Sequence, residues 1–208
     1  AEEVARIPPT GPLVVVANHP HGLVDGMVMA EIVNRVRSDF KILTRSLLTG
    51  IPEVEEFMIP VPFPHEENAR ELGLKMREDT MTHLKKGGAV ILFPAGRVAC
   101  SDGWFGPAIE GEWNLFTHKM IHKSGATILP MHFTGQNSRA YQIANHVSAT
   151  LRQGLLLHEI RRALFRPQRP HIGAPIPASA LKDWEGNPRG FLAWLRDHTL
   201  ALGSDGRP

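Results

Sequence analysis

Short apolar runs alternate with longer amphipathic stretches along most of this 208-residue chain. Short runs rich in β-branched residues and bounded by Gly or Pro are typical of buried strands, and apolar residues recurring every three or four positions predict helices. The pattern predicts strands at residues 13–17, 40–44, 57–61, 89–93, 127–133 and 170–176. It predicts helices at residues 25–37, 66–86, 110–123, 150–165 and 189–202. This alternation indicates an α/β fold, a single domain over residues 1–208 with a largely parallel central sheet flanked by helices.

Composition and charge narrow the functional class only a little. The net charge of +2, from 23 basic and 21 acidic residues, is too balanced to indicate nucleic-acid binding. The lone Cys100 excludes an internal disulfide framework and a multi-cysteine metal site. No apolar run approaches the roughly 20 residues that span a bilayer, and the first residues lack the basic-then-apolar pattern of a signal peptide. We therefore expect a protein that acts without nucleic acid.

Three polar loops directly follow predicted strands, at residues 18–25, 93–103 and 134–139. In parallel sheets, ligands gather where strands end at their carboxyl termini. We therefore predict that the three loops form one composite site.

The first of these loops places His19, His21 and Asp25 within seven residues. An imidazole beside a carboxylate suits general-base catalysis, because the carboxylate fixes the ring tautomer and stabilises the imidazolium that forms. When an acyl group moves to an alcohol, the nucleophile is the substrate's own hydroxyl, so Cys100 is interpreted as incidental. The alternative interpretation is that both histidines merely cap a helix.

The second loop, FPAGR at residues 93–97, offers backbone N–H groups near Gly96 and a cation at Arg97. Such groups stabilise an oxyanion or hold a phosphate. Taken alone, the segment is equally an ordinary turn between a strand and a helix.

Together the loops resemble the motifs of the glycerolipid and lysophospholipid acyltransferase superfamily. The segment NHPHGLVD (18–25) resembles its NH-x4-D catalytic motif, FPAG (93–96) its FPEG-type motif, and ILPM (128–131) its fourth motif. The Asn137–Ser138 pair and the IGAPIP segment (172–177) are similar to the bacterial hemolysin-like branch, which includes lyso-ornithine-lipid acyltransferases. The resemblance places the motif-bearing core at about residues 13–177.

This resemblance implies a function and roles for individual residues. It implies an O-acyltransferase that moves a fatty acyl group from an acyl-carrier-protein or coenzyme A thioester to the hydroxyl of a lysolipid, such as a lysophospholipid or lyso-ornithine lipid. It assigns His19 as general base with Asp25 as its partner. It implies no acyl-enzyme, no resident cofactor and no metal. The substrate-binding residues that it implies are Asn18, Phe93, Pro94, Ala95, Gly96 and Asn137. The arginine of the family's second motif has no clear match, and Arg45 and Arg97 are the cationic candidates near the site.

Two departures from the family pattern keep alternatives open. Five residues separate His19 from Asp25, where the motif has four, and three separate His21 from Asp25, so His21 is the alternative base. Ala95 stands where the family has Glu. The rival functions are a metal-dependent hydrolase, with His132 and His171 completing a ligand set around the first loop, and a catalytically inactive lipid-binding module.

A lipid acceptor implies contact with a membrane surface. We expect a peripheral protein at the cytoplasmic face of a bacterial inner membrane. The apolar stretch at residues 57–63 and the Trp104–Phe105 pair are the candidate contact segments, and core packing is the alternative for each.

Overall fold

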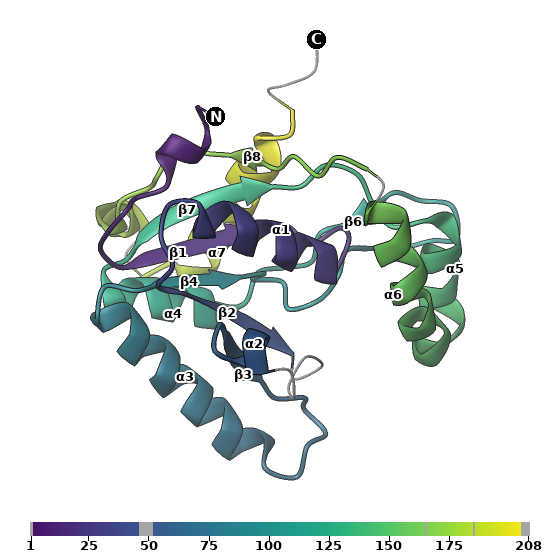
Figure 1. Cartoon of the computed structure of the whole chain (residues 1–208), viewed down its shortest axis with the longest axis horizontal. Coiled ribbons are helices and arrows are strands. Elements are labelled where there is room, and N and C mark those ends of the chain that lie inside the picture. The colour runs from purple at the N-terminus through teal and green to yellow at the C-terminus, as the bar shows by residue number, and fades with distance from the viewer. Residues whose placement is uncertain (1, 46–51, 165, 185, 205–208) are drawn as a thin grey trace.

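The computed structural model describes residues 2–45, 52–164, 166–184 and 186–204 and contains a central twisted sheet (Figure 1). Among these residues the sheet has six strands in the order β3-β2-β4-β1-β7-β8. All neighbouring strands are parallel except β8, which runs antiparallel to β7. The predicted α/β fold with a largely parallel sheet is thus confirmed. The strands are β1 (Leu13–Ala17), β2 (Phe40–Arg45), β3 (Met58–Val61), β4 (Ala89–Leu92), β7 (Thr127–His132) and β8 (His171–Ile172).

Helices cover both faces of this sheet (Figure 1). They are α1 (Leu23–Asn34), α2 (Pro52–Glu55), α3 (Ala69–Lys85), α4 (Leu115–Ser124), α5 (Arg139–Val147), α6 (Ala149–Leu164) and α7 (Pro188–Ala201). Two 3-10 helices, η1 (Val4–Arg6) and η3 (Ala178–Trp184), and a separate hairpin of β5 (Cys100–Ser101) and β6 (Ala108–Ile109) complete the described elements. Within the described residues, no helix combines the length and apolar character needed to cross a bilayer.

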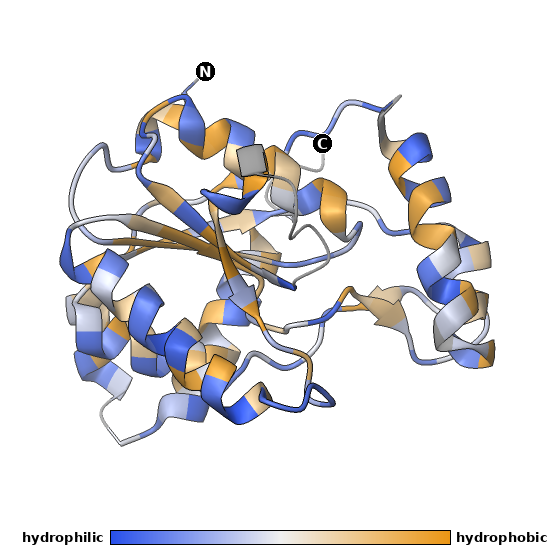
Figure 2. Ribbon diagram, turned by 60° about the horizontal axis from the view of Figure 1, so that its bottom comes forward, coloured by the Kyte–Doolittle hydropathy of each residue, from blue (hydrophilic) through white to orange (hydrophobic). Residues whose placement is uncertain are grey.

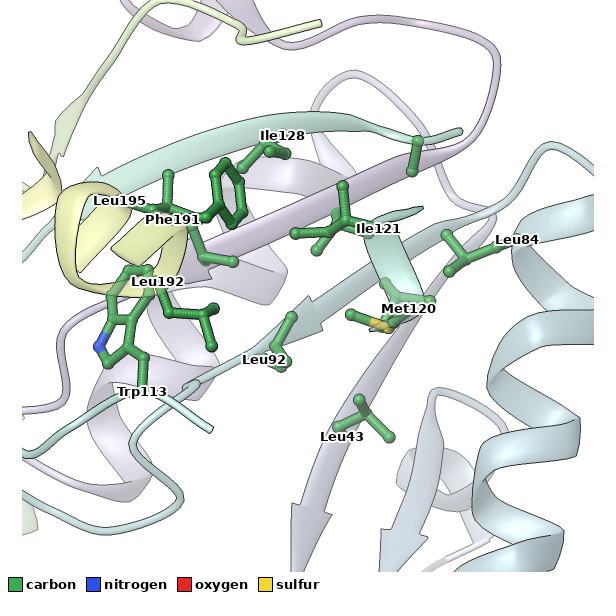
Figure 3. Packing of buried hydrophobic residues seen from close by; sticks show 14 of the residues in the cluster. Leu43, Leu84, Leu92, Trp113, Met120, Ile121, Ile128, Phe191, Leu192 and Leu195 are labelled. Atoms are coloured by element: carbon green, nitrogen blue, oxygen red, sulfur yellow. The ribbon is translucent and has the colours of Figure 1, made fainter. Parts of the chain in front are cut away.

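Strand β1 lies at the centre of the sheet because every one of its side chains is apolar. Each of its residues is 0% exposed. Successive side chains on a strand point to opposite faces. Val14 and Val16 therefore pack on one face with α3, α4 and α7, whose side chains Figure 3 shows. Leu13, Val15 and Ala17 pack on the other face with α1. Figure 2 shows the resulting hydrophobic band through the interior.

The register of β1 with its two neighbours brings the predicted loops together. Leu13 lies opposite Ala89 on β4 and Thr127 on β7, and all three strands run in the same direction. The loops that follow β1, β4 and β7 therefore leave the same edge of the sheet, which is the arrangement that a composite site requires.

Several predicted element boundaries were wrong. The helix predicted from residue 110 begins at Leu115, because Asn114 caps it by accepting a hydrogen bond from the Phe116 N–H. Helix α5 was missed altogether; Ser138 caps it in a segment whose polar residues suggested a loop. The hairpin was missed: β5 lies within the loop predicted at 93–103 and β6 lies beyond it. The strand predicted at 170–176 reduces to β8 and an isolated bridge at Ile176.

The apolar stretch at residues 57–63 packs into the interior. Met58 and Ile59 are buried, and the Phe57 ring stacks on Phe40 with centroids 5.2 Å apart. Core packing therefore accounts for Met58 and Ile59, and the membrane contact predicted for the stretch stays a prediction. Trp104 and Phe105, by contrast, are 52% and 80% exposed.

Candidate active site

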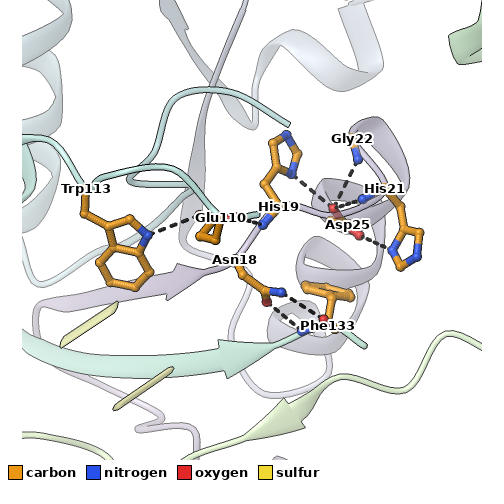
Figure 4. Close-up of polar contacts among 8 residues, drawn as sticks. All are labelled: Asn18, His19, His21, Gly22, Asp25, Glu110, Trp113 and Phe133. Carbon is orange, nitrogen blue, oxygen red and sulfur yellow. Dashed lines mark hydrogen bonds and ion pairs between the residues drawn. The ribbon is translucent and has the colours of Figure 1, made fainter. Parts of the chain in front are cut away.

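The first loop is tied to the sheet as soon as β1 ends. The Asn18 side chain donates to the Phe133 carbonyl oxygen (2.8 Å) and accepts from the Phe133 N–H (2.7 Å), so it joins the loops after β1 and β7 (Figure 4). Asn18 is only 6% exposed, and it does not line the cavity that contains His19, which is called the main cavity below. These contacts give Asn18 a structural role, and its predicted contact with substrate stays a prediction.

The loop then turns into α1 at Gly22, whose φ of +77° favours glycine. A β-carbon there would find room, in ordinary van der Waals contact with the side chains of Val98 and Leu156 at 3.4 and 3.6 Å, so the backbone conformation is what calls for glycine. Asp25, in the first turn of α1, accepts a hydrogen bond from the Gly22 N–H, so the start of the helix fixes the carboxylate.

Asp25 is fully buried and binds both histidines of the loop (Figure 4). His19 Nδ1 lies 3.1 Å from Oδ2 and His21 Nδ1 lies 3.0 Å from Oδ1. Oδ2 also accepts the backbone N–H of His21 at 2.8 Å. Burial by itself would raise the pKa of Asp25, but the hydrogen bonds from His19 and His21 and the charge on their rings together hold it below its ordinary value of 3.8. Asp25 is therefore an anion throughout the range in which an imidazole accepts protons.

The two imidazoles face different spaces. His19 lines the main cavity, and its second ring nitrogen points away from Asp25 (Figure 4). Its ring stacks on Phe93, with centroids 3.8 Å apart and planes inclined by 19°. His21 lines a smaller polar pocket on the far side of the loop, where its Nε2 lies against Gly135. The two candidates for the base therefore face different pockets: His19 can contact a ligand in the main cavity, and His21 can contact one in the smaller polar pocket.

The main cavity has a volume of about 380 Å³ and is bordered mainly by apolar side chains. Four predicted substrate-binding residues line it together with His19: Arg45, Phe93, Pro94 and Gly96. Arg45 and Arg77 are the cationic residues on its wall in the described part of the chain. The Arg45 guanidinium lies over the Phe63 ring, 4.8 Å from its centroid, and also donates to the Pro62 carbonyl. Such a site suits a ligand with a long apolar part and an anionic group.

The other predicted residues of the FPAGR loop lie outside this cavity. Ala95 packs against the hydrophobic core, and Arg97 is exposed with its guanidinium close to the Gly111 backbone. The Gly96 N–H donates to the Phe93 carbonyl oxygen at 2.9 Å. This donor, predicted to stabilise an oxyanion, is thus committed to a turn.

The two remaining candidates, Asn137 and Cys100, do not line the main cavity. Asn137 is buried, with its Nδ2 unpaired, and does not border the main cavity. Burial raises the pKa of the Cys100 thiol, and this makes it a poor nucleophile at neutral pH. The interpretation of Cys100 as incidental is consistent with both observations.

Glu110 is a site residue that the sequence analysis missed. Its carboxylate, 7% exposed, accepts the His19 backbone N–H at 3.1 Å and the Trp113 indole N–H at 3.1 Å (Figure 4). Burial raises its pKa, and the two hydrogen bonds oppose that shift. No spacing in the sequence links Glu110 to His19, since 91 positions separate them and the contact exists only in the folded chain.

The metal-ligand set considered for a hydrolase does not assemble around the first loop. His132 and His171 lie opposite each other on β7 and β8, and they border a different pocket from His19. Among the described residues, no group of three or more His, Cys, Asp or Glu side chains has a metal-binding arrangement.

Comparisons with known proteins identify the family and a similar fold. A family model described as acyltransferase matches residues 2–134. A lyso-glycine lipid O-acyltransferase from Phocaeicola vulgatus is 27% identical over 209 residues, covering 95% of this chain and 70% of the relative. The fold is similar to the crystal structure of the 1-acyl-sn-glycerophosphate acyltransferase PlsC from Thermotoga maritima. That match has a TM-score of 0.56 and 16% identity, and covers 99% of this chain and 71% of the other.

Proposed function

This chain belongs to the acyltransferase family, within the glycerolipid acyltransferase superfamily that its motifs resemble, and we propose that it transfers a fatty acyl group from a thioester to the hydroxyl of a lysolipid. One observation carries the proposal. His19, held by the buried anion of Asp25, lies on the wall of a mainly apolar cavity, and its second ring nitrogen points away from Asp25 (Figure 4).

In the proposed mechanism His19 is the general base. Its Nδ1–H donates to Asp25, so Nε2 carries the lone pair that takes the proton of the acceptor hydroxyl. The hydroxyl oxygen then attacks the thioester carbonyl carbon, the C–S bond breaks, and the departing sulfur takes the proton from His19. Asp25 stabilises the imidazolium between these two proton transfers. The products are an ester and a free thiol, and no acyl-enzyme forms.

The wall of the cavity supports a lysolipid with an anionic group as acceptor. Its apolar lining suits an acyl chain, and Arg45 and Arg77 are placed to pair with a phosphate or a carboxylate. The Phocaeicola vulgatus relative is a lyso-glycine lipid O-acyltransferase. We therefore extend the proposed acceptors from lysophospholipid and lyso-ornithine lipid to lyso-glycine lipid.

The donor and the location follow from the same chemistry. Acyl carrier protein or coenzyme A supplies the thioester as co-substrate, and the protein needs no resident cofactor. Because a lysolipid resides in a membrane, we propose peripheral association with the cytoplasmic face of a bacterial inner membrane.

Mass spectrometry of the lipid products tests the proposal. The purified protein is incubated with lyso-ornithine lipid, lyso-glycine lipid and lysophosphatidic acid, each with both acyl donors. We expect an acylated product and an equal amount of released thiol for at least one pair, and background levels with His19→Ala. A folded protein that acylates none of the acceptors overturns the proposal and favours the inactive lipid-binding module. Family membership already argues against the metal-dependent hydrolase.

A further inference from the structure

Exposed apolar side chains gather on the hairpin β5–β6 and at the junction of α5 and α6. Trp104 and Phe105, between the two hairpin strands, are 52% and 80% exposed, and Val147 and Leu151, at the helix junction, are 61% and 51% exposed. Large apolar side chains on a surface commonly mark an interaction site. We call these four residues, with the arginines described below, the lobe surface.

A ring contact and two hydrogen bonds hold the hairpin and α5 together. The Trp104 ring lies against the His146 ring of α5, with centroids 5.6 Å apart. Arg139, at the start of α5, donates to the carbonyl oxygens of Phe105 and Gly106. The apolar side chains of the hairpin and the helix junction therefore belong to one supported lobe, which lies at one end of the molecule, away from α3 (Figure 1).

The charge of this lobe is strongly positive although the whole chain is nearly neutral. Residues 100–109 and 139–169 contain six arginines and two acids, a net charge of +4, while the whole chain carries +2. One of the acids, Glu159, is buried, which leaves Asp102 as the exposed acid of these segments. Arg161, Arg166 and Arg169 are exposed. Exposed apolar side chains and exposed arginines in one lobe are the composition that binds the surface of an anionic bilayer.

The lobe also borders the catalytic loop. Leu156 of α6 lines the cavity that contains His19, and it lies within van der Waals reach of a β-carbon at Gly22. The next residue, Leu157, is 76% exposed. A bilayer in contact with this lobe would therefore lie beside the cavity that the proposed function assigns to the lysolipid.

We propose that the lobe surface is the membrane-docking surface of this protein and that it selects anionic lipid bilayers. Trp104 and Phe105 enter the interface between head groups and acyl chains, and the arginines of α6 and of the segment that follows it pair with lipid phosphates. The proposal adds a surface and a lipid charge class to the peripheral association proposed above. It requires no catalysis, so binding tests it independently of acyl transfer.

Sedimentation with vesicles tests the proposal directly. One set of vesicles is phosphatidylcholine alone, and the other contains about one third phosphatidylglycerol. We expect the full chain to sediment with the anionic set only. The double variants Trp104→Ser/Phe105→Ser and Arg161→Gln/Arg169→Gln should each lower the partition coefficient roughly tenfold or more.

The chain supplies a matched control on its far side. Leu72 and Leu74 on α3 are also exposed, at 41% and 58%, and Leu72→Ser/Leu74→Ser should bind vesicles as the parent does. Equal binding to both vesicle types, or a hairpin variant that binds like the parent, overturns the proposal. Loss of activity with acyl carrier protein in Arg161→Gln/Arg169→Gln, with vesicle binding unchanged, also overturns it and assigns the surface to an acidic protein.

Fluorescence locates the contact without a disruptive substitution. Anionic vesicles with brominated acyl chains should quench part of the tryptophan emission of the parent. Trp104→Phe keeps an apolar ring, so it should keep most of the binding and lose that quenching. Quenching that persists in Trp104→Phe places the membrane contact elsewhere and contradicts the proposal.

Discussion

The imidazole of His19 lies almost flat on the ring of Phe93, with ring centroids 3.8 Å apart. Phe93 directly follows β4, so the sheet fixes its position, and its ring also contacts α1 near Gly26. The stack and the hydrogen bond to Asp25 together leave His19 one orientation. Phe93 thus contributes to the site by orienting the His19 ring.

We expect Phe93→Ala to lower kcat by about tenfold to a hundredfold, because a freely rotating imidazole is seldom aligned with the hydroxyl. Phe93→Leu restores bulk beneath the ring and should recover much of the loss. Steady-state kinetics with the best lysolipid acceptor checks both. A Phe93→Ala variant that changes KM alone would show that Phe93 acts only as cavity wall.

His19→Ala and His21→Ala should differ sharply in activity. His19→Ala removes the proposed base and should lower kcat by about 10²–10⁴. His21→Ala leaves Asp25 bound to His19 and to two backbone N–H groups, so we expect a loss of only roughly tenfold, from a looser carboxylate. Single-turnover rates and melting temperatures of both variants separate chemistry from folding. Retained activity in His19→Ala with none in His21→Ala would move the base to His21.

Asp25→Asn should lower kcat by about 10³–10⁴. Asp25 only accepts hydrogen bonds from its partners, whereas the amide of asparagine directs an N–H group at one of them. The carboxylate that keeps the proton of His19 on Nδ1 is then lost. It should also lower the melting temperature, since four N–H groups converge on the buried carboxylate. Asp79→Asn, an equal change of charge at an exposed position of α3, is the control and should leave both values unchanged. Near-parental turnover by Asp25→Asn contradicts the assigned role.

Glu110→Gln tests the contact that holds the backbone of His19. A carboxylate accepts from both His19 N–H and Trp113 Nε1–H, whereas glutamine must turn an N–H group toward one of them. We expect a loss of about 1–3 kcal/mol in the free energy of unfolding. The same substitution should cost less in Trp113→Phe, where one donor is already absent. Urea unfolding of the parent, the two single variants and the double variant checks this. An equal loss of unfolding free energy with and without Trp113 would mean that the two hydrogen bonds to Glu110 are independent of each other.

His132 makes stability depend on pH. Burial and, second, the charge of His171 lower the pKa of His132 from its ordinary value of 6.5. Between the lowered value and 6.5, only the unfolded chain binds the proton. This contribution to stability is therefore complete above pH 6.5 and is lost as the pH falls through the folded-state pKa.

We expect the urea concentration at half-unfolding to decrease as the pH is lowered from about 7.5 to about 5.5. In His132→Asn this decrease should be smaller. His158→Asn, at an exposed position of α6, is the control and should keep the parental slope. Parallel slopes for the parent and His132→Asn would contradict the assignment to His132.

Much of the fold was predictable because local pattern and burial agree in the sheet. The range predicted for β1 is the observed one, since five consecutive apolar residues have no stable place except the centre of a parallel sheet. Helix α5 was not predictable in the same way. It is amphipathic but only nine residues long, and it is held by the Ser138 cap and by the Gln142 side chain, which accepts a hydrogen bond from the Ser101 N–H.

The site was predictable where its residues are neighbours in the sequence and not where folding brings them together. His19, His21 and Asp25 meet across one loop and one helical turn, a distance that spacing alone can indicate. Glu110 and Arg77 reach the site from remote segments. The proposed roles of these residues in catalysis stay predictions until the variants above are measured.

The amide of Asn18 has a consequence for how the catalytic loop moves. The amide donates one hydrogen bond to the Phe133 backbone and accepts one from it. This side chain thus makes the pair of hydrogen bonds that the backbone of a further β1 residue would have made. The ladder between β1 and β7 thus extends one step past the last strand residue, and the chain departs from the sheet at an anchored point. Thermal displacement of His19 should therefore be closer to that of the sheet than to that of an ordinary surface loop.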